Sequence, residues 1–479
     1  MKHLLLIWAV FIPIWAMFGC SPKSYQSYTP AEKGKELPED AIENLSDAVQ
    51  IPTISYEKEA PEDFDTLKFR EFHRLLEERY PLIHENMELE IVNEMSMLYK
   101  WEGKNDDKKP VLFLAHHDVV PIEAPDRWTH PPFSGKIAES YIWGRGTLDD
   151  KGSIIAAFEA AEKLLEQDFE PDRSVYFAFG HDEEIGGRKG ALEMANILKE
   201  RGVDFEYSLD EGGMVSEGLV PGMDKPVALI GTANKGYLSL QLTVQGTGGH
   251  SSMPPKENSV SILAGALKKL EANPFPARLS APVHDFLDHI GPEQSFFNRL
   301  AMTNRWLFSG VIKRQYSKTA TGDATVRTTM APTMLNAGIK DNVIPAEAKA
   351  VVNLRLLPGT SKADAIERIR KILDDDRISI SQYGNYSPPT PVSSYDSEGF
   401  RNLRDLTNAH FDSVAVAPYL VIAGTDSRHY TEVARDNYRF LPIVLDSEGL
   451  DRIHGIDEKI SFENFRTMYS FYYHWLREP

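Results

Sequence analysis

Cysteine is almost absent from this chain of 479 residues. The single cysteine, Cys20, lies near the N-terminus, so the rest of the chain can form no disulfide and offers no thiol nucleophile. Basic charge is also scarce, because 52 Lys and Arg residues stand against 71 Asp and Glu residues, a formal charge of −19. A general nucleic-acid binder needs a basic surface, so this balance excludes that class of protein. The surplus carboxylates favour solubility, and some of them are free to hold cations.

The N-terminus carries the features of an export signal. Lys2 precedes an apolar run from Leu4 to Phe18, which is short for a membrane-spanning helix and suits a secretory signal peptide. The run ends in "MFGC", which resembles the lipobox of bacterial lipoproteins, in which Cys20 would become the lipidated first residue. A plain signal peptide or an uncleaved anchor is the open alternative. We predict an exported protein with a signal peptide at 1–20, a flexible polar tether at 21–40, and a lipid anchor as its only membrane contact.

The next part of the chain alternates apolar strands with amphipathic helices, and it shows no internal repeat. The patterns predict strands at 111–118, 174–180 and 207–213, and helices at 151–167 and 187–202. This order is typical of an α/β fold, an open and mostly parallel sheet with helices on both faces. Ligands of such folds bind beyond the carboxyl ends of the strands.

After Lys235 the pattern changes to strands that alternate with period 2. We expect strands at 236–246, 348–359 and 377–384, with helices at 258–272 and 362–375. This predicts a smaller α+β lid domain at 235–386, inserted between catalytic parts at 41–234 and 387–479. The stretch 275–330 has no pattern that predicts its structure. Its apolar segment "FFNRLAMTNRWLFSGVI" either forms lid core or lines a pocket for a long acyl chain.

Polar side chains collect at the ends of the predicted strands. They occur in "HHD" (116–118), "LDDKG" (148–152), "DEE" (182–184) and "LDEGG" (209–213). Each motif alone is typical of a solvated turn or of a hydrogen-bonded pair, but all four would open onto the same edge of one sheet. Strand alternation places His116 and Asp118 on one side and His117 on the other. Carboxylates this close together resist burial unless a cation compensates them, so the set indicates a divalent metal site with nitrogen and oxygen ligands.

Eight motifs, in order along the chain, resemble those of one enzyme family: "AHHDVVP", "WGRGTLDDKG", "DEEIGG", "LDEGG", "GGHSSMPP", "NVIP", "GTDSRHY" and "RIHGIDEKIS". They are similar to the di-zinc metallopeptidases of aminoacylase and carboxypeptidase S (peptidase family M-twenty). The likeness covers about 45–479 and is greatest to the branch of carboxypeptidase S and the secreted N-fatty-acyl-amino-acid hydrolases. It implies a zinc exopeptidase-like fold whose lid also serves dimerisation. It also implies hydrolysis of the amide bond of N-acyl amino acids or of short peptides with a free C-terminal carboxylate.

The resemblance implies two divalent metal ions with five ligands: His116, Asp149, Glu184, Asp210 and His454. His116 would bind one ion, His454 the other, and Asp149 would bridge the two. Members of the family differ in whether the ligand of "LDEGG" is Asp210 or Glu211, and we favour Asp210. Zinc is the expected metal, with cobalt and manganese as alternatives, because histidine and carboxylate ligands accept all three.

The same likeness gives roles to residues beside the metals. Glu183 would be the general base that takes a proton from water and delivers it to the leaving amine. Asp118 would accept a hydrogen bond from His116 and fix its tautomer. His250, on the lid, would stabilise the oxyanion and could reach the site of a partner subunit. Arg428 would bind the carboxylate of the substrate, and Arg355 is a weaker candidate for the same role. Asn342 would also contact the substrate.

Two other functions remain open. The enzyme could be a carboxypeptidase or dipeptidase rather than an acylase, since both reactions attack the same type of bond. A metal-binding protein without catalysis would keep the fold, but the presence of Glu183 beside a complete ligand set argues against it.

Overall fold

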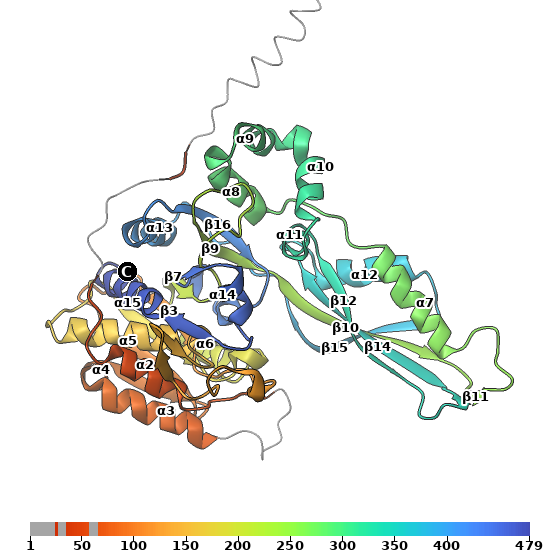
Figure 1. Ribbon diagram of the computed structural model, residues 1–479, viewed down its shortest axis with the longest axis horizontal. Helices are drawn as coiled ribbons and strands as arrows, with labels where there is room; N and C mark the ends of the chain where they lie inside the picture. The colour runs from red at the N-terminus through yellow and green to blue at the C-terminus, as the bar shows by residue number, and fades with distance from the viewer. Residues whose placement is uncertain (1–23, 27–34, 57–65) are drawn as a thin grey trace, which may run out of the picture.

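The computed structural model describes residues 24–26, 35–56 and 66–479, which form two lobes (Figure 1). The predicted signal peptide at 1–20, the lipobox-like cysteine and part of the predicted tether lie outside the described residues. Within these ranges no helix combines the length and the apolarity needed to cross a membrane.

A ten-stranded sheet runs through the large lobe in the order β1-β2-β6-β3-β7-β17-β9-β8-β18, with β16 also paired to β9. Its strands are β1 (Glu88–Val92), β2 (Ser96–Trp101), β3 (Val111–His116), β6 (Val175–Gly180), β7 (Phe205–Asp210), β8 (Val215–Ser216), β9 (Val227–Asn234), β16 (Ala415–Val421), β17 (Ala434–Arg439) and β18 (Val444–Leu445). The central strands β6, β3, β7 and β17 are parallel, whereas β1, β2 and β6 pair antiparallel. The prediction of an α/β fold with a mostly parallel sheet is confirmed.

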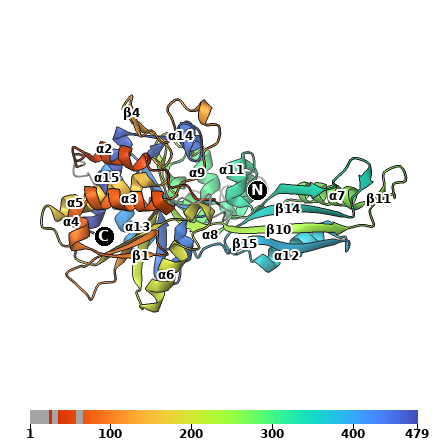
Figure 2. The same ribbon diagram turned by 90° about the horizontal axis from the view of Figure 1, so that it is seen from below.

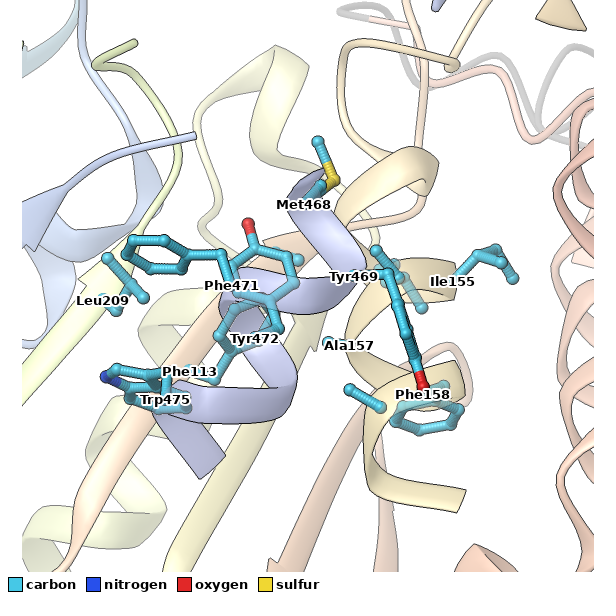
Figure 3. Close-up of a cluster of buried hydrophobic side chains, with 14 of the residues drawn as sticks. Phe113, Ile155, Ala157, Phe158, Leu209, Met468, Tyr469, Phe471, Tyr472 and Trp475 are labelled. Atoms are coloured by element: carbon cyan, nitrogen blue, oxygen red, sulfur yellow. The ribbon is translucent and has the colours of Figure 1, made fainter. Parts of the chain in front are cut away.

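Helices cover both faces of this sheet. One face packs against α2 (Ala41–Val49), α3 (Thr66–Arg79), α4 (Pro81–Asn86), α5 (Lys151–Leu165), α13 (Glu398–His410) and α15 (Phe462–Arg477). Phe113 of β3 lies in that core, with its ring 5.0 Å from Tyr472 and 5.8 Å from Trp475 of α15 (Figure 3). Its neighbours Leu112 and Leu114 point to the other face, where α6 (Ala191–Glu200) packs on the far side of the lobe (Figure 2). This alternation along β3 makes the two apolar layers.

The second lobe is a four-stranded antiparallel sheet with its own core. The order is β12 (Thr329–Ala337), β14 (Glu347–Leu356), β10 (Gly236–Gln245) and β15 (Ile378–Ser387). Helices α7 (Ser259–Ala272) and α12 (Lys362–Leu373) pack on it. The short strands β11 (Gly249–His250) and β13 (Val343–Ile344) pair at the end farthest from the large lobe (Figures 1 and 2). The sequence predicted these elements with the exception of β11, β12 and β13.

The stretch without a readable pattern forms four α-helices: α8 (Ala281–Ile290), α9 (Phe296–Thr303), α10 (Arg305–Tyr316) and α11 (Ala320–Val326). Side chains of α8 pack against β9 and β16 of the large sheet. The apolar segment "FFNRLAMTNRWLFSGVI" makes up α9 and most of α10, of which only Ile312 is buried. The expectation that it forms lid core is therefore wrong, because these helices lie on the large lobe and leave most of their apolar side chains outside the core.

Short elements complete the chain. They are η1 (Pro125–Arg127), β4 (Lys136–Ala138), β5 (Tyr141–Trp143), η2 (Glu183–Ile185), η3 (Gly291–Glu293), η4 (Asp426–His429), α14 (Ser447–Arg452) and β19 (Lys459–Ser461). A three-stranded sheet pairs β19 with β5 and β5 with β4. Trp143 of β5 pairs with Lys459 of β19, so the segment that follows residue 143 lies beside the segment that precedes residue 459.

Candidate metal centre

The predicted polar residues meet at one edge of the large sheet. His116 is the last residue of β3, and Asp210 is the last residue of the adjacent parallel strand β7. On the other side of β3, strand β6 ends at Gly180 and leads into η2, which contains Glu183 and Glu184. Parallel pairing therefore places these carboxyl ends side by side, as the strand pattern predicted.

Asp149 lies between two histidines. Its Oδ1 is 2.8 Å from His116 Nε2, and its Oδ2 is 3.0 Å from His454 Nε2. The residue stands directly before α5, and the peptide bond that joins it to Asp150 is cis. Each oxygen of one carboxylate thus faces a different imidazole, which is the arrangement of a ligand shared by two metal ions.

Glu184 adds a further carboxylate on the side of His454. Its Oε2 is 3.1 Å from His454 Nε2, while its buried Oε1 has no hydrogen-bond partner among the described residues. Burial, with the charge of Asp149, raises the pKa of Glu184 to about 7. Hydrogen bonds to Asp149 and Glu184 raise the pKa of His454 to about 10. The imidazole therefore carries an extra proton, which a bound cation would displace.

The donor set fits divalent metal ions. Ligand atoms of His116, Asp149 and Glu184 lie within 4.8 Å of one another. Imidazole nitrogens and carboxylate oxygens are the ligands of zinc, cobalt and manganese. The orphaned oxygen of Glu184 and the crowding of negative charge are both relieved by a cation at this place.

Asp118 holds together the two strand ends that flank this centre. Its Oδ1 and Oδ2 accept the backbone N–H groups of Glu183 at 3.1 Å and Glu184 at 3.2 Å. The hydroxyl of Ser55 donates to Oδ2 at 2.7 Å. His116 Nδ1 lies 3.0 Å from the backbone oxygen of Asp118 and 3.3 Å from its Oδ1. The residue therefore orients both the histidine and the turn with the two glutamates.

His117 has a different environment from its neighbour. It is fully buried on the other side of the strand, where its ring stacks on Phe72 at 5.4 Å and meets Phe69 edge-on. Burial, together with the positive charges of His73 and His181, holds the pKa of His117 well below its usual range. His117 thus belongs to the apolar packing, as strand alternation predicts.

The two acidic residues of "LDEGG" are held differently. Asp210 is buried, and its oxygens accept the N–H groups of Glu211 at 3.0 Å and Ser427 at 2.8 Å. Each of these oxygens keeps a second lone pair for a cation. Burial, then the charges of Asp149 and Asp210, raises the pKa of Glu211 well above its usual range. Asp210 ends the strand next to that of His116, and of the two acids it has the more rigid support.

The carboxylate of Glu183 lies next to the guanidinium of Arg428 and not next to a histidine. Its Oε1 is 3.6 Å from Nη2 of Arg428, which comes from η4, and that Nη2 makes no hydrogen bond within the described part of the chain. Burial raises the pKa of Glu183 to about 8, although the charges of Arg428 and His116 oppose the rise. Asp426 lies 4.0 Å from the same guanidinium. Glu183 is therefore paired with an arginine whose Nη2 can still donate a hydrogen bond to another group.

Sequence reasoning missed Glu458, which stabilises the loop with Asp149. Glu458 is fully buried, and its Oε1 accepts the N–H groups of Gly146 at 2.8 Å and Leu148 at 2.9 Å. Its other oxygen forms an ion pair with the buried Arg145. The signal was present, because Glu458 stands in the same motif as His454, "RIHGIDEKIS".

His250 and Asn342 lie away from this centre within the chain. His250 is in β11 and Asn342 directly precedes β13, and both side chains are exposed at the outer end of the lid (Figure 1). Ser252 donates its N–H and its hydroxyl to His250 Nδ1 at 3.1 and 2.9 Å. The backbone oxygen of Asn342 accepts from Ser251 at 3.2 Å. The structure brings these two residues near each other and not near the histidines.

Arg355 lies at the opposite end of the lid sheet, close to the large lobe. Its guanidinium carbon is 4.8 Å from the ring centre of Tyr237. Burial, and then the positive charge of Arg428, lowers the pKa of Arg355. Two arginines therefore face the same region between the lid and the centre.

The chain matches known proteins over most of its length. Residues 112–478 match the model of "Peptidase family M20/M25/M40". The chain is 42% identical over 440 residues to a carboxypeptidase S-like protein of Dictyostelium discoideum, covering 91% of this chain and 85% of that protein. It is 39% identical over 435 residues to the N-fatty-acyl-amino acid synthase/hydrolase of Xenopus tropicalis, covering 90% and 84%.

A solved structure shares the fold. The M20 family metallo-carboxypeptidase Sso-CP2 of Sulfolobus solfataricus superposes with a TM-score of 0.68 at 17% sequence identity, over 92% of this chain and 99% of that one. The two chains therefore share their overall fold.

Proposed function

The chain belongs to peptidase family M20/M25/M40, and from this premise we propose that the centre around Asp149 is its active site. The protein is a metal-dependent hydrolase of the amide bond in N-acyl amino acids or in short peptides with a free C-terminal carboxylate. One observation carries the assignment of the site. The two oxygens of Asp149 face His116 and His454, which come from distant parts of the chain.

The ligands of two divalent ions are then His116, Asp149, Glu184, Asp210 and His454. Asp149 would serve both ions, while His116 would hold one ion and His454 the other. We assign zinc, with cobalt or manganese as substitutes that the same donors accept. When bound, the ions polarise the scissile carbonyl and make a water acidic enough to lose a proton near neutral pH.

Glu183 is the general base in this account. Its carboxylate has no histidine partner and sits in the turn next to Glu184, so an oxygen is free to take the proton of the attacking water. The same carboxyl group then gives that proton to the nitrogen of the leaving amine. Asp118 accepts the backbone N–H of Glu183, which keeps the turn in place during both transfers.

The substrate carboxylate binds beside Glu183. Arg428 is half-buried, and its unbonded Nη2 can donate to a carboxylate oxygen. Arg355 faces the same region from the lid and would add a second positive charge. A free C-terminal carboxylate in the substrate would satisfy both arginines, whereas an amidated or esterified one would not.

The lid acts on a partner subunit in this proposal. His250 and Asn342 lie at the outer end of the lid, so they cannot contribute to the centre of their own chain in this arrangement (Figure 1). In a homodimer formed through the lid sheet of β10, β12, β14 and β15, His250 of one chain would reach the other centre and donate to the oxyanion. Catalytic parts at 41–234 and 387–479 would then hold the metals, and the lid would complete the site.

Hydrolysis of a substrate panel tests the proposal and separates acylase from peptidase. N-acetyl and N-fatty-acyl amino acids are compared with dipeptides, each with a free or an amidated C-terminus, with zinc supplied. We expect cleavage of free acids that a chelator abolishes and that zinc restores. Preference for the acyl amino acids would establish an acylase, and preference for dipeptides would establish the carboxypeptidase alternative.

A matched pair of variants tests the base. Glu183→Gln keeps the shape of the side chain and removes its proton acceptor, so we expect a loss in kcat of at least about a hundredfold with KM little changed. Glu200→Gln, at the exposed end of α6, makes the same chemical change away from the centre and should have no effect. Full activity of Glu183→Gln would overturn the role of Glu183.

Export and anchoring through Cys20 belong to the same proposal. The apolar run at 4–18 followed by Gly19 and Cys20 supports a lipidated N-terminus on the outer side of the cell membrane. Mass spectrometry of the N-terminal peptide distinguishes the two alternatives. A diacylglyceryl mass on Cys20 supports the anchor, and an unmodified Cys20 in the exported protein contradicts it.

A further inference from the structure

Helices α9 and α10 expose large apolar side chains to water. Phe297 is 78% exposed, Trp306 79% and Val311 63%, and Phe296 and Leu307 are about half exposed. The two helices lie at the top of the large lobe, beyond α8 (Figure 1). Adjacent exposed aromatic and aliphatic groups of this kind mark an interaction site on a soluble protein.

The exposed side chains of α10 share one face of the helix. Trp306, Leu307, Gly310, Val311 and Arg314 are exposed, and their spacing places them along one stripe. Ile312, on the opposite face, is the buried residue of this helix. The apolar stripe therefore faces outward, and the helix is anchored to the lobe from its other side.

The charge around this stripe is opposite to that of the chain. Residues 296–318 contain no acidic residue and five basic ones: Arg299, Arg305, Lys313, Arg314 and Lys318. Arg305 pairs with Asp288, whereas Arg299, Arg314 and Lys318 are exposed. In a chain with a net charge of −19, this is a local basic surface. Aromatic and basic side chains together are typical of surfaces that rest on anionic lipid headgroups.

Tyr25 and Gln26 are held against α8 and β16, and α8 leads into α9. The side chain of Gln26 donates to the backbone oxygens of His289 at 3.3 Å and Val416 at 3.0 Å, and it accepts from the N–H of Val416 at 2.9 Å. The ring of Tyr25 stacks on His289 at 4.3 Å. His289 is in α8, and only η3 separates α8 from α9.

This attachment limits where an N-terminal anchor can lie. Ser24 is the first described residue, and a fully extended chain from Cys20 to Ser24 spans at most about 14 Å. A membrane that holds the chain at or before Cys20 must therefore lie close to the side of the large lobe formed by α8. That is the side on which α9 and α10 present their apolar and basic residues.

We propose that the surface formed by the exposed residues of α9 and α10, called here the α9–α10 surface, rests on an anionic lipid bilayer. Phe297, Trp306 and Val311 enter the interface, while Arg299, Arg314 and Lys318 meet lipid phosphates. A second copy of the chain fits the surface less well, because it would bring the same basic residues face to face. The surface fixes how the enzyme sits on the membrane, which an anchor alone cannot do.

A fluorophore placed on the α9–α10 surface tests this proposal in the full chain. This test rests on the lipid anchor proposed above, which occupies the native thiol of Cys20, so a single introduced cysteine can carry an environment-sensitive label. Val311→Cys puts the label on the surface, and Met334→Cys puts it on the exposed lid strand β12 as a matched control. Both proteins are reconstituted, through the lipid on Cys20, in phosphatidylcholine vesicles with and without phosphatidylglycerol.

We expect spin-labelled lipid to quench the label at position 311 and not the label at position 334. Arg299→Glu, Arg314→Glu and Lys318→Glu together should reduce the quenching at position 311 by about tenfold in anionic vesicles. A label at position 311 that stays in water while the protein is vesicle-bound would overturn the proposal. Protection of that label by self-association without vesicles would also overturn it, in favour of a second copy.

Discussion

At the scale of single residues, the proposed metal centre depends on side chains that hold its candidate ligands in place. Glu458 does this for Asp149, because it accepts two N–H groups of the loop from 146 to 148 and pairs with Arg145. Asp118 does it for His116 and for the turn at Glu183. The ligands come from distant parts of the chain, so their geometry is set by these buried supports.

Glu458→Gln tests that dependence. The amide keeps the shape of the side chain but leaves the buried Arg145 without its counter-ion, so we expect the free energy of unfolding to fall by about 3 kcal/mol. The loop with Asp149 should loosen, and zinc affinity should fall with it. Urea denaturation and zinc titration measure the two effects. Glu463→Gln, exposed at the start of α15, is the control, and an equal loss in both variants would contradict the role of Glu458.

Gly187 gives a second test at this scale. Its φ is +65°, and an added Cβ would collide with the carboxylate of Asp426. Gly202 has a similar φ of +71° with nothing within 4 Å of an added Cβ. At both positions, alanine in the left-handed backbone conformation lowers the free energy of unfolding by about 1 kcal/mol. We expect Gly187→Ala to cost more and to lower kcat, because the turn with Glu183 must shift, while Gly202→Ala keeps full activity. Equal stability and activity of the two variants would contradict this.

Residue patterns predicted part of the centre and not all of it. Polar residues at the ends of adjacent parallel strands predicted a metal site near His116, and ligand atoms of His116, Asp149 and Glu184 lie within 4.8 Å of one another. Asp149 stands before α5 rather than at the end of a parallel strand, and the roles of Asp149 and Asp210 as ligands stay predictions from the resemblance. His454 follows an exposed helix, α14, at a position with φ +59°. A turn of this kind has no repeating pattern of apolar residues, so only the resemblance to the family predicted His454 as a ligand.

At the scale of elements, a strand or helix could be predicted from the sequence only where its buried apolar residues recur at a regular spacing. The strands β3, β6 and β7 and the helices α5, α7 and α12 have clear apolar patterns and were predicted. Strand β12 is exposed along most of its length and contains Pro332, so it shows no alternation. Helices α9 and α10 bury almost nothing, so no inward apolar stripe marks them.

Lys235 links the two lobes at the point where β9 passes into β10. Its buried Nζ donates to the backbone oxygens of Ala324 and Arg327, each at 2.8 Å. Burial, and then the charge of Arg355, lowers the pKa of Lys235 from 10.5 to about 7. Between these two pH values the unfolded chain binds a proton that the folded chain lacks, so this residue makes stability rise with pH.

We therefore expect the unfolding free energy of the natural chain to rise relative to Lys235→Met by about 2 kcal/mol between pH 7 and pH 9. Below the folded pKa both states hold the proton, and the difference should level off. Urea denaturation at a series of pH values measures it. Lys268→Met, on the exposed face of α7, is the matched control, and the same pH dependence in both variants would contradict the account of Lys235.

At the scale of the whole molecule, the proposal that the lid acts on a partner subunit requires two chains for each complete site. His250→Ala and Glu183→Gln should each inactivate the enzyme. In a mixture that exchanges subunits, a hybrid dimer has one site with both residues intact, so equal mixing should restore about a quarter of the activity. Steady-state hydrolysis measures the recovery. An inactive mixture in which hybrid dimers are shown to form would contradict action of the lid on a partner.

The central claim is that Asp149 shares its two oxygens between two metal ions, and calorimetric zinc titration of the metal-free protein tests it most directly. We expect two zinc ions per natural chain, one for His454→Ala, and neither with high affinity for Asp149→Asn, because that change weakens both sites at once. Binding of two ions to Asp149→Asn with the affinity of the natural chain would contradict the account.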